Sequence, residues 1–420
     1  MSSQQVPAVV FLSLALALAL TPTAAESTRI HGIDLVWHWE GAGSSGAHQA
    51  NTAINPASVV KLATTLWALE TLGPDHRFRT TVAVRGTIDA ETGVLHGDLI
   101  VRGGGDPDFH VENAQLVAQR LLDLGIRSVA GTLYVNEGFW IGWERGSEGT
   151  LLDTKDRARR MARRLSAAWD PRTWSRETLN AMRRYRETRP GVKFLHLPVQ
   201  HVAGMDEGVP AKRPLVEHLS NPLKMILKRF NDYSNNDIER LEYHLGSPTA
   251  MERFYRERWD DPQPEIRFET LSGLGSNRMS PSQITRLIGE LKTAAAAHGL
   301  GLADLLPALD CGRNTLRNYR GLLTDLPAGS LVGKTGTLVQ TDGGVVTLAG
   351  SLSTDRGDVN FFIGAPNNGA RMNAARRAQT RWLLDHARKW TVRPVECVEE
   401  TLYSHQDASA SDAQSQAENY

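Results

Sequence analysis

The chain has 420 residues, of which 41% are hydrophobic, so it can bury more than one core, and two domains are the expected arrangement. Lys and Arg together number 47, as do Asp and Glu, so the net charge is zero. This balance gives no indication of nucleic-acid binding, and no nucleic-acid partner is expected.

The first 25 residues differ in composition from the rest of the chain. Residues 8–20 form an apolar run of the length found in signal peptides, and small residues follow, so cleavage after Ala25 is expected. No Lys or Arg precedes Arg29, so the usual basic start is missing and a membrane anchor remains the alternative, although about 13 residues is short for one. We expect an exported protein, periplasmic or otherwise extracytoplasmic, that is soluble or loosely membrane-associated.

The next region is predicted to change from a strand and a helix to a group of short strands. The strand covers residues 33–39, and the helix covers residues 57–71 and ends at Gly73-Pro74. From Phe78 onward, Gly and Asp turns separate short apolar runs. The predicted strands are residues 80–86, 93–102 and 131–135, with a helix at residues 111–124.

Two stretches of this middle region have unusual compositions. Residues 103–107 read Gly-Gly-Gly-Asp-Pro, and we interpret them as a structural turn, because neither a phosphate-binding loop nor a dinucleotide-binding pattern fits. Residues 151–190 are helix-prone and contain twelve Lys and Arg against five acids. They are either a solvated helical insertion or a patch for an anionic cell-wall polymer.

The second half is predicted to be helical first and then to form an antiparallel sheet. Helices are expected at residues 215–233, at residues 238–245 before Gly246, and at residues 281–298 after the cap residue Ser280. Strands are expected at residues 330–334, 345–353 and 359–365, followed by a closing helix at residues 370–389. Residues from about 404 onward are polar and are expected to be a disordered tail.

Three short motifs occur in an order that carries chemical meaning. They are Ser58-x-x-Lys61, Ser234-Asn235-Asn236 and Lys334-Thr335-Gly336-Thr337. Each motif alone is a weak signal, and Ser58 by itself would be an ordinary polar residue at a helix start. Their joint order is the signature of penicillin-recognising enzymes with an active-site serine.

The first motif has a direct physical reading. Pro56 can set the first turn of a helix, which places Ser58 and Lys61 on one face about a turn apart, where an amine can take the hydroxyl proton. The chain contains 9 lysines against 38 arginines, yet lysine occupies both motif positions. Arginine cannot be deprotonated in a protein, so a general base at position 61 must be the amine.

Three longer stretches resemble the D-alanyl-D-alanine carboxypeptidase/endopeptidase family, the class C low-molecular-mass penicillin-binding proteins. They are residues 97–107, 215–246 and 272–278. The resemblance covers most of residues 30–390, with a gap near residues 145–190. It implies an α/β (α+β) penicillin-recognising serine transpeptidase/β-lactamase-like domain with an inserted, mostly β domain. The motif serines are 176 positions apart, too many for a compact β-lactamase.

The resemblance also implies a domain organisation. After a signal peptide at residues 1–25, a discontinuous catalytic domain covers residues 26–75 and 215–395. The inserted domain covers residues 76–214, including the basic segment 151–190, which replaces part of the family's outer insertion. A polar tail covers residues 396–420.

The mechanism that the resemblance implies is acyl transfer through a serine ester. Ser58 attacks the carbonyl of the penultimate D-alanine, and Lys61, held neutral by burial and by the nearby positive Lys334, takes its proton. Ser234 relays a proton to the leaving D-alanine amine, while Asn236 holds the substrate's amide and steadies Lys61. No metal or cofactor is expected, since no His/Cys/Asp cluster has metal-ligand spacing.

Substrate binding is implied for the third motif, including Gly336. Lys334 and Thr335 attract the terminal carboxylate, and the backbone N–H groups of Ser58 and Thr337 form an oxyanion hole worth about 3 kcal/mol per donor. The expected partners are peptidoglycan stem peptides, with β-lactam antibiotics as inhibitors. The sequence does not decide between trimming the terminal D-alanine and cutting the cross-link, and it leaves the oligomeric state open.

Three other functions share parts of this pattern. A β-lactamase needs a deacylating base, typically in a Glu-x-x-Leu-Asn run after the second motif, which Ile238-Glu239-Arg240-Leu241 does not reproduce. A catalytically silent cell-wall-binding protein has no need for an activated nucleophile. A simple esterase shares the nucleophile, and release of D-alanine from a D-Ala-D-Ala peptide would separate all of these.

Two further features leave their consequences open. Residues 270–275 read Thr-Leu-Ser-Gly-Leu-Gly where the family has Asp-Gly-Ser-Gly-Leu-Ser, a difference that bears on the packing of the site's floor. Cys311 and Cys397 are the only cysteines. They can pair in an oxidising compartment if the fold brings them together.

Overall fold

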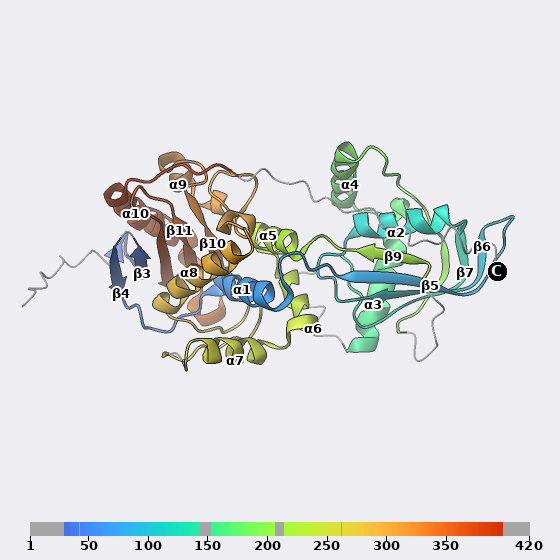
Figure 1. Cartoon of the computed structure of the whole chain (residues 1–420), viewed down its shortest axis with the longest axis horizontal. Coiled ribbons are helices and arrows are strands. Elements are labelled where there is room, and N and C mark those ends of the chain that lie inside the picture. Colours follow the sequence, from blue (N-terminus) through green and yellow to red (C-terminus); the bar gives the residue numbers. More distant parts are fainter. Residues whose placement is uncertain (1–28, 42, 143–152, 206–213, 262, 398–420) are drawn as a thin grey trace, which may run out of the picture.

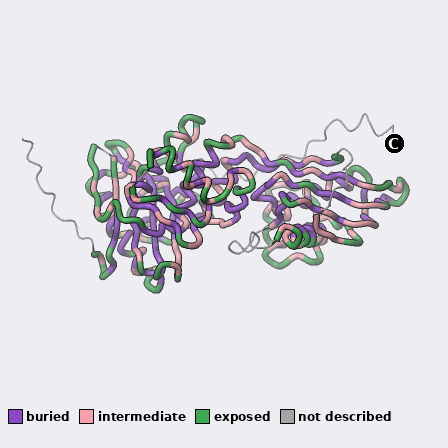
Figure 2. The backbone as a smooth tube through the Cα atoms, turned by 90° about the horizontal axis from the view of Figure 1, so that it is seen from below, coloured by how far each residue is buried: buried purple, intermediate pink, exposed green. Residues whose placement is uncertain are grey.

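The computed structural model describes residues 29–41, 43–142, 153–205, 214–261 and 263–397, which form two lobes (Figure 1). Buried residues gather in the middle of each lobe, so each has a core of its own (Figure 2). The expected signal peptide and nearly all of the expected tail lie outside the described residues. Within the described residues, no helix combines the length and the apolar character that crossing a membrane requires.

The larger lobe is built on a five-stranded antiparallel sheet with the order β10-β11-β12-β3-β4. Its strands are β3 (Val36–Gly41), β4 (Ser44–His48), β10 (Leu331–Leu338), β11 (Val345–Leu352) and β12 (Val359–Pro366). The antiparallel strands predicted in the last third are therefore confirmed. β12 also pairs with β3, so the first and last parts of the chain share one sheet. A short ribbon of β1 (Arg29–Ile30) and β2 (Ile33–Asp34) precedes β3.

Helices cover both faces of this sheet (Figure 1). On one face lie α8 (Pro281–Ala297) and, against it, α1 (Val60–Leu72); on the other lie α9 (Arg320–Asp325) and α10 (Met372–Trp390). Helix α8 begins at the predicted cap: the Gln283 N–H donates to Ser280 Oγ, and the Ser280 N–H donates to the Gln283 side chain. The lobe is completed by α5 (Leu223–Tyr233), α6 (Glu242–Leu245) and α7 (Pro248–Arg258).

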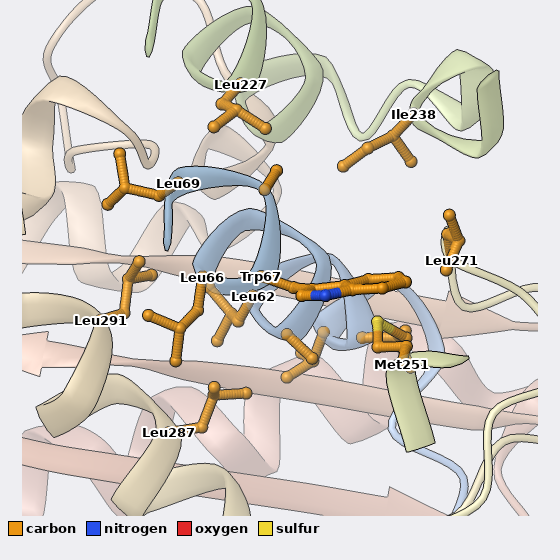
Figure 3. Packing of buried hydrophobic residues seen from close by; sticks show 14 of the residues in the cluster. Leu62, Leu66, Trp67, Leu69, Leu227, Ile238, Met251, Leu271, Leu287 and Leu291 are labelled. Carbon is orange, nitrogen blue, oxygen red and sulfur yellow. The ribbon is translucent and has the colours of Figure 1, made fainter. Parts of the chain in front are cut away.

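Helix α1 is enclosed by apolar side chains. All of its residues from Val60 to Leu69 are buried, as expected for a helix that is apolar all round. Figure 3 shows side chains of α1 packed among those of α5, α7, α8 and neighbouring loops, which include Leu227, Ile238, Met251, Leu271, Leu287 and Leu291. This packing fixes the start of α1, where the first motif lies.

The smaller lobe contains a mixed five-stranded sheet with the order β8-β7-β6-β5-β9. Its strands are β5 (Arg79–Ile88), β6 (Val94–Gly103), β7 (Ser128–Val135), β8 (Val199–Val202) and β9 (Val216–Leu219). The helices α2 (Val111–Asp123) and α3 (Thr154–Ala168) share its apolar core, and α4 (Arg176–Thr188) lies beside α2 (Figure 1). The three strands and the helix predicted before residue 136 are therefore confirmed.

The helix predicted at residues 215–233 is wrong in its first part. Val216–Leu219 form strand β9, and α5 begins only at Leu223. β9 pairs with β5, with Thr80 opposite His218, so a distant partner satisfies these backbone groups. Pro222, which has no N–H to donate, then precedes the first turn of α5. The smaller lobe's sheet therefore continues past residue 214, where the inserted domain was predicted to end.

The basic segment consists of two helices with different surroundings. Helix α3 buries Ala158, Met161, Ala162 and Leu165 in the lobe's core, so this half is not a solvated insertion. Helix α4 is largely exposed, and Met182 is its one buried residue among those whose burial is described. Its arginines therefore lie on the surface, whereas the apolar face of α3 is structural.

A disulfide joins two segments of the larger lobe. Cys311 and Cys397 are bonded, with their Cα atoms 5.4 Å apart and 86 positions between them in the chain. Cys311 precedes β10 and Cys397 follows α10. The pairing that the sequence left open is thus present.

Buried polar contacts connect the two lobes. Arg240 of the larger lobe lies 3.0 Å from Asp237, and both side chains are almost fully buried. The Arg240 guanidinium also donates to the carbonyl oxygens of Pro107 and Gly142 in loops of the smaller lobe, at 3.1 and 2.7 Å, and lies over the Trp140 ring. One guanidinium therefore ties together three segments that are distant in sequence.

Candidate active site

Ser58 and Lys61 lie at the start of the central helix α1. A 3-10 turn, Ala57–Val59, leads into α1, so the predicted helix begins here but not with an α-helical turn. Ser58 is the one residue between Ile54 and Leu69 that is not buried. Lys61 is fully buried, and its Nζ lies 3.2 Å from Ser58 Oγ. The structure thus places an accessible hydroxyl against a buried amine.

The other contacts of Lys61 orient its amine. Nζ donates to Asn236 Oδ1 at 3.0 Å and to the carbonyl oxygen of Ser272 at 2.6 Å. Burial lowers the pKa of Lys61 to about 7, against the opposing effect of the Glu239 charge. A neutral amine has two N–H donors, and these two oxygens accept both of them. Its lone pair is then left for the hydroxyl proton of Ser58.

The turn that carries Ser58 is held between two glycines. A Cβ on Gly336 would lie 2.8 Å from the Pro56 oxygen, and one on Gly273 would lie 2.9 Å from Ser58 Cα, so neither position has room for a side chain. Ala57 has a φ of +50°, in the left-handed region that L residues rarely adopt. Such strain persists only where the surroundings impose it.

Ser234 and Lys334 form a second linked pair. Ser234 caps the end of α5 in the left-handed conformation, with a φ of +53°. Lys334 of β10 is fully buried, and its Nζ donates to Ser234 Oγ and to the carbonyl oxygen of Thr335, both at 2.9 Å. Burial and the charge of Lys61 lower the pKa of Lys334, while Asp232 opposes this shift. The two motif lysines therefore affect each other's charge.

The remaining motif residues lie around these pairs. Asn236 opens a 3-10 helix, Asn236–Leu241, and reaches Lys61. Thr335 is buried, whereas Thr337 is partly exposed and donates from Oγ1 to the Gly336 oxygen at 2.8 Å. Because Gly336 lies against Pro56, the edge of β10 runs beside the Ser58 turn. The structure thus brings all three motifs together, and the roles given to the backbone N–H groups of Ser58 and Thr337 stay predictions.

The floor of the site depends on residues that the motifs do not reveal. The buried carboxylate of Glu239 accepts the N–H groups of Leu271 and Ser272, both at 3.1 Å. Thr64 of α1 donates to the Leu271 oxygen at 2.6 Å. These bonds hold the Ser272 carbonyl oxygen in the position where it accepts a hydrogen bond from Lys61 Nζ. The altered residues 270–275 thus form an ordered floor, and only the family resemblance singled out this stretch in the sequence.

One further contact at the rim was not foreseen from the sequence. Arg376 of α10 donates from Nη2 to Thr337 Oγ1 at 3.2 Å. No spacing rule connects a residue in the closing helix with the third motif, so only the fold reveals the contact. Taken together, the site offers an activated hydroxyl, a neutral amine beside it, the amine of Lys334 on β10, and the guanidinium of Arg376 at the rim. This set suits acyl transfer through serine.

Two sequence comparisons point to one family. Residues 44–156 match the D-Ala-D-Ala carboxypeptidase 3 (S13) family. The chain is also 39% identical over 90 residues to a D-alanyl-D-alanine carboxypeptidase of Actinomadura sp. (strain R39). That match covers 21% of this chain and 16% of the relative, so it spans only a small part of the relative's length.

Two solved structures from Bdellovibrio bacteriovorus extend the likeness to nearly the whole chain. The predatory endopeptidase Bd0816, in complex with immunity protein Bd3460, has a TM-score of 0.74 at 23% identity, covering 90% of this chain and 98% of that one. Penicillin G-acylated Bd3459, also with Bd3460, has a TM-score of 0.73 at 21% identity, covering 89% and 97%. These likenesses show a shared fold. Together, the comparisons agree with the resemblance seen in the sequence, since residues 44–156 are similar to the D-Ala-D-Ala carboxypeptidases and nearly the whole chain shares the fold of the predatory endopeptidases.

Proposed function

We propose that this protein is a serine-type D-Ala-D-Ala carboxypeptidase that acts on peptidoglycan stem peptides through an acyl-enzyme and is acylated by penicillin. The observation that carries the proposal is the amine of Lys61, which donates to Asn236 and to the Ser272 carbonyl and faces Ser58 Oγ at 3.2 Å. A DD-endopeptidase activity is the companion proposal. It is supported by the fold shared with the predatory endopeptidases.

The first step forms the acyl-enzyme. The neutral Lys61 amine takes the proton of Ser58, and Ser58 Oγ bonds to the carbonyl carbon of the penultimate D-alanine. Ser234, hydrogen-bonded to Lys334, passes its proton to the leaving D-alanine nitrogen and regains one from the Lys61 ammonium, which becomes neutral again. The C–N bond breaks, and the terminal D-alanine leaves as the free amino acid.

The second step is hydrolysis of the ester. Water attacks the acyl carbon and gives a proton to the neutral amine of Lys61, the Ser58–acyl bond breaks, and Ser58 regains its proton from Lys61. A β-lactam follows the first step only, because its leaving nitrogen stays tethered to the acyl group. Glu239 is engaged by two backbone N–H groups, which argues against a role as the deacylating base of a β-lactamase. We therefore expect the penicilloyl ester to persist.

The proposed site of action is outside the cytoplasm, periplasmic or otherwise extracytoplasmic. The apolar run at residues 8–20 supports this proposal. The bond between Cys311 and Cys397 supports it independently, because disulfides persist in oxidising compartments.

Labelling with a fluorescent penicillin tests the proposal. The wild-type protein should acquire one covalent label that survives denaturation, and Ser58→Ala should acquire none. In parallel, a diacetylated tripeptide that ends in D-Ala-D-Ala should release free D-alanine. Labelling that persists in Ser58→Ala contradicts the assigned nucleophile. Labelling of the wild type without D-alanine release from the tripeptide or from cross-linked stem peptides would leave only a penicillin-binding protein.

A further inference from the structure

Arg376 is a cation at the rim of the proposed site that the mechanism above does not use. It lies in the first turns of α10, and its Nη2 donates to Thr337 Oγ1 at 3.2 Å. Both side chains are partly exposed, so a ligand along β10 can reach them. Among the residues that the structure describes, no carboxylate pairs with Arg376. A guanidinium without an acidic partner beside a binding strand is suited to an anionic ligand.

The buried lysine of the third motif is a poor sole partner for that anion. Lys334 Nζ already donates to Ser234 Oγ and to the Thr335 oxygen. It is fully buried next to the amine of Lys61, an environment that disfavours its charged form. A guanidinium keeps its charge at every working pH and presents several N–H donors in one plane, which fits a carboxylate. Arg376 therefore supplies a permanent charge that Lys334 does not.

We propose that Arg376 is a specificity-determining residue that, with the hydroxyl of Thr337, binds the free carboxylate at the C-terminal side of the scissile bond. The inference rests on the proposed function, because it assigns a partner to the carboxylate of the D-Ala-D-Ala substrate. Thr337 then has two roles, since its hydroxyl contacts the carboxylate while its strand lies beside Ser58. The site accordingly discriminates between a free acid and the same group with its charge removed.

Paired substrates that differ only in this charge test the inference. One pair is a D-Ala-D-Ala peptide and its C-terminal amide, and the other is a penicillin and its methyl ester, followed as acylation of Ser58. The variant Arg376→Gln should lower kcat/KM for the acid of each pair by about 10- to 100-fold, the effect of a lost charge-assisted hydrogen bond. The amide and the ester should change less than about threefold. Arg376→Lys should retain part of the preference for the acid.

A neighbouring arginine provides the matched control. Arg377 is exposed on the same helix and has no ion pair among the described residues, so Arg377→Gln changes the same charge without touching Thr337. It should leave both substrate pairs unaffected. Equal losses for acid and ester in Arg376→Gln would mean that Arg376 only supports the fold of β10, and unchanged rates would also overturn the inference. A wild type that is acylated by penicillin but cleaves no peptide sinks the peptidase proposal, while the penicillin pair still tests Arg376.

Discussion

At the scale of single residues, the two motif lysines differ in what surrounds them. The Lys61 amine is placed between two carbonyl-type oxygens and a hydroxyl, so its free lone pair has one direction. The Lys334 amine donates to a serine hydroxyl and to a backbone oxygen, so it is linked to Ser234 and not to Ser58. The two motif lysines thus have different hydrogen-bond partners, and the roles of base and cation predicted for them stay predictions.

Replacing Lys61 should abolish acylation. Lys61→Arg carries a permanent charge and cannot accept a proton, and Lys61→Met keeps the volume without the amine. We expect the rate of penicillin acylation to fall by about 10²- to 10⁴-fold in both, the usual effect of losing a general base. Lys334→Arg should be milder, because a cation can still hold a carboxylate. Stopped-flow labelling measures these rates, and equal losses in the Lys61 and Lys334 variants would mean that the two roles are wrongly assigned.

The acylation rate should depend on pH through Lys61. Its pKa is lowered by burial to about 7, and the neutral form is the base, so kcat/KM should rise as pH increases through 7 and level off above it. The charge of Glu239 opposes the lowering. Glu239→Gln should therefore move the rising limb to lower pH, while keeping an acceptor for one backbone N–H. A limb that moves to higher pH would contradict this electrostatic assignment.

The sequence predicts those site residues that belong to its short motifs, and it misses those that lie outside the motifs. Ser58 and Lys61 are one helical turn apart, so their meeting is a local matter that spacing can reveal. Glu239 and Arg376 act on residues more distant in the chain, and each contact depends on how separate elements pack. No sequence pattern around Glu239 or Arg376 predicts these contacts.

At the scale of elements, glycines set how closely the loop of residues 270–275 and strand β10 approach the Ser58 turn. Gly273 has a φ of +89°, and a Cβ there would collide with the Ala57 oxygen. Gly336 occupies the corresponding close approach from β10. The nucleophile is thereby held from both sides by backbone alone.

Gly273→Ala should impair the site more than it impairs the fold. The left-handed conformation costs about 1–2 kcal/mol for an L residue, and relief of the collision moves Ser58. We expect a loss of acylation of at least about tenfold together with this lower stability. Gly299→Ala is the control, since Gly299 has a φ of +71° with no atom near its Cβ position. Gly299→Ala should lower the stability without the loss of acylation. Similar acylation rates in the Gly273→Ala and Gly299→Ala variants would contradict the idea that Gly273 holds the Ser58 turn in place.

The exposed arginines of helix α4 lead us to expect that salt weakens the binding of this protein to anionic polymers. Arg183 and Arg184 are exposed on it, and neither forms an ion pair among the described residues. Changing both to Gln should weaken retention on isolated cell walls at low salt and leave turnover of a small D-Ala-D-Ala peptide nearly unchanged. Arg313→Gln with Arg317→Gln makes the same charge change on the larger lobe. Retention that responds neither to salt nor to the α4 variant would remove the electrostatic explanation.

The elements that the sequence predicts well carry their own signals. Helix α8 has a cap at Ser280, and β10 to β12 have apolar runs bounded by Gly and Asp turns. Strand β9 was mistaken for helix because its four residues are decided by pairing with β5. Strand β4, Ser-Ser-Gly-Ala-His, has no apolar alternation and becomes a strand only because it pairs with β3.

At the scale of the whole molecule, arginine side chains of the larger lobe connect it to the smaller lobe. Arg240 reaches two loops of the smaller lobe while paired with Asp237. Arg229 of α5 makes a second connection, 3.0 Å from Asp108 of the smaller lobe. The 3-10 helix that begins at Asn236 therefore adjoins both the active site and the lobe interface.

Arg240→Met should uncouple the lobes and destabilise the protein. It leaves Asp237 buried without the cation 3.0 Å away, which typically costs about 3–5 kcal/mol. Adding Asp237→Asn should recover part of this loss, because it removes the buried charge that Arg240 faced. The control Arg256→Met breaks an exposed pair with Glu265 and should cost less than about 1 kcal/mol. Denaturant unfolding measures all three, and a loss for Arg240→Met no larger than the control's would contradict the interface role.

The pairing of β3 with β12 has a consequence for how the protein is made. The smaller lobe's sheet uses strands from one continuous stretch, residues 79–219, so a growing chain can complete that sheet early. Strand β3, by contrast, pairs with β12, with Trp39 opposite Phe361. Pairings between segments so far apart in the chain form late. Lys61 and Lys334 likewise come near each other from positions 273 residues apart in the chain. The active site is therefore complete only when almost the entire polypeptide has been synthesised. Until then, Ser58 of the nascent chain is not expected to react.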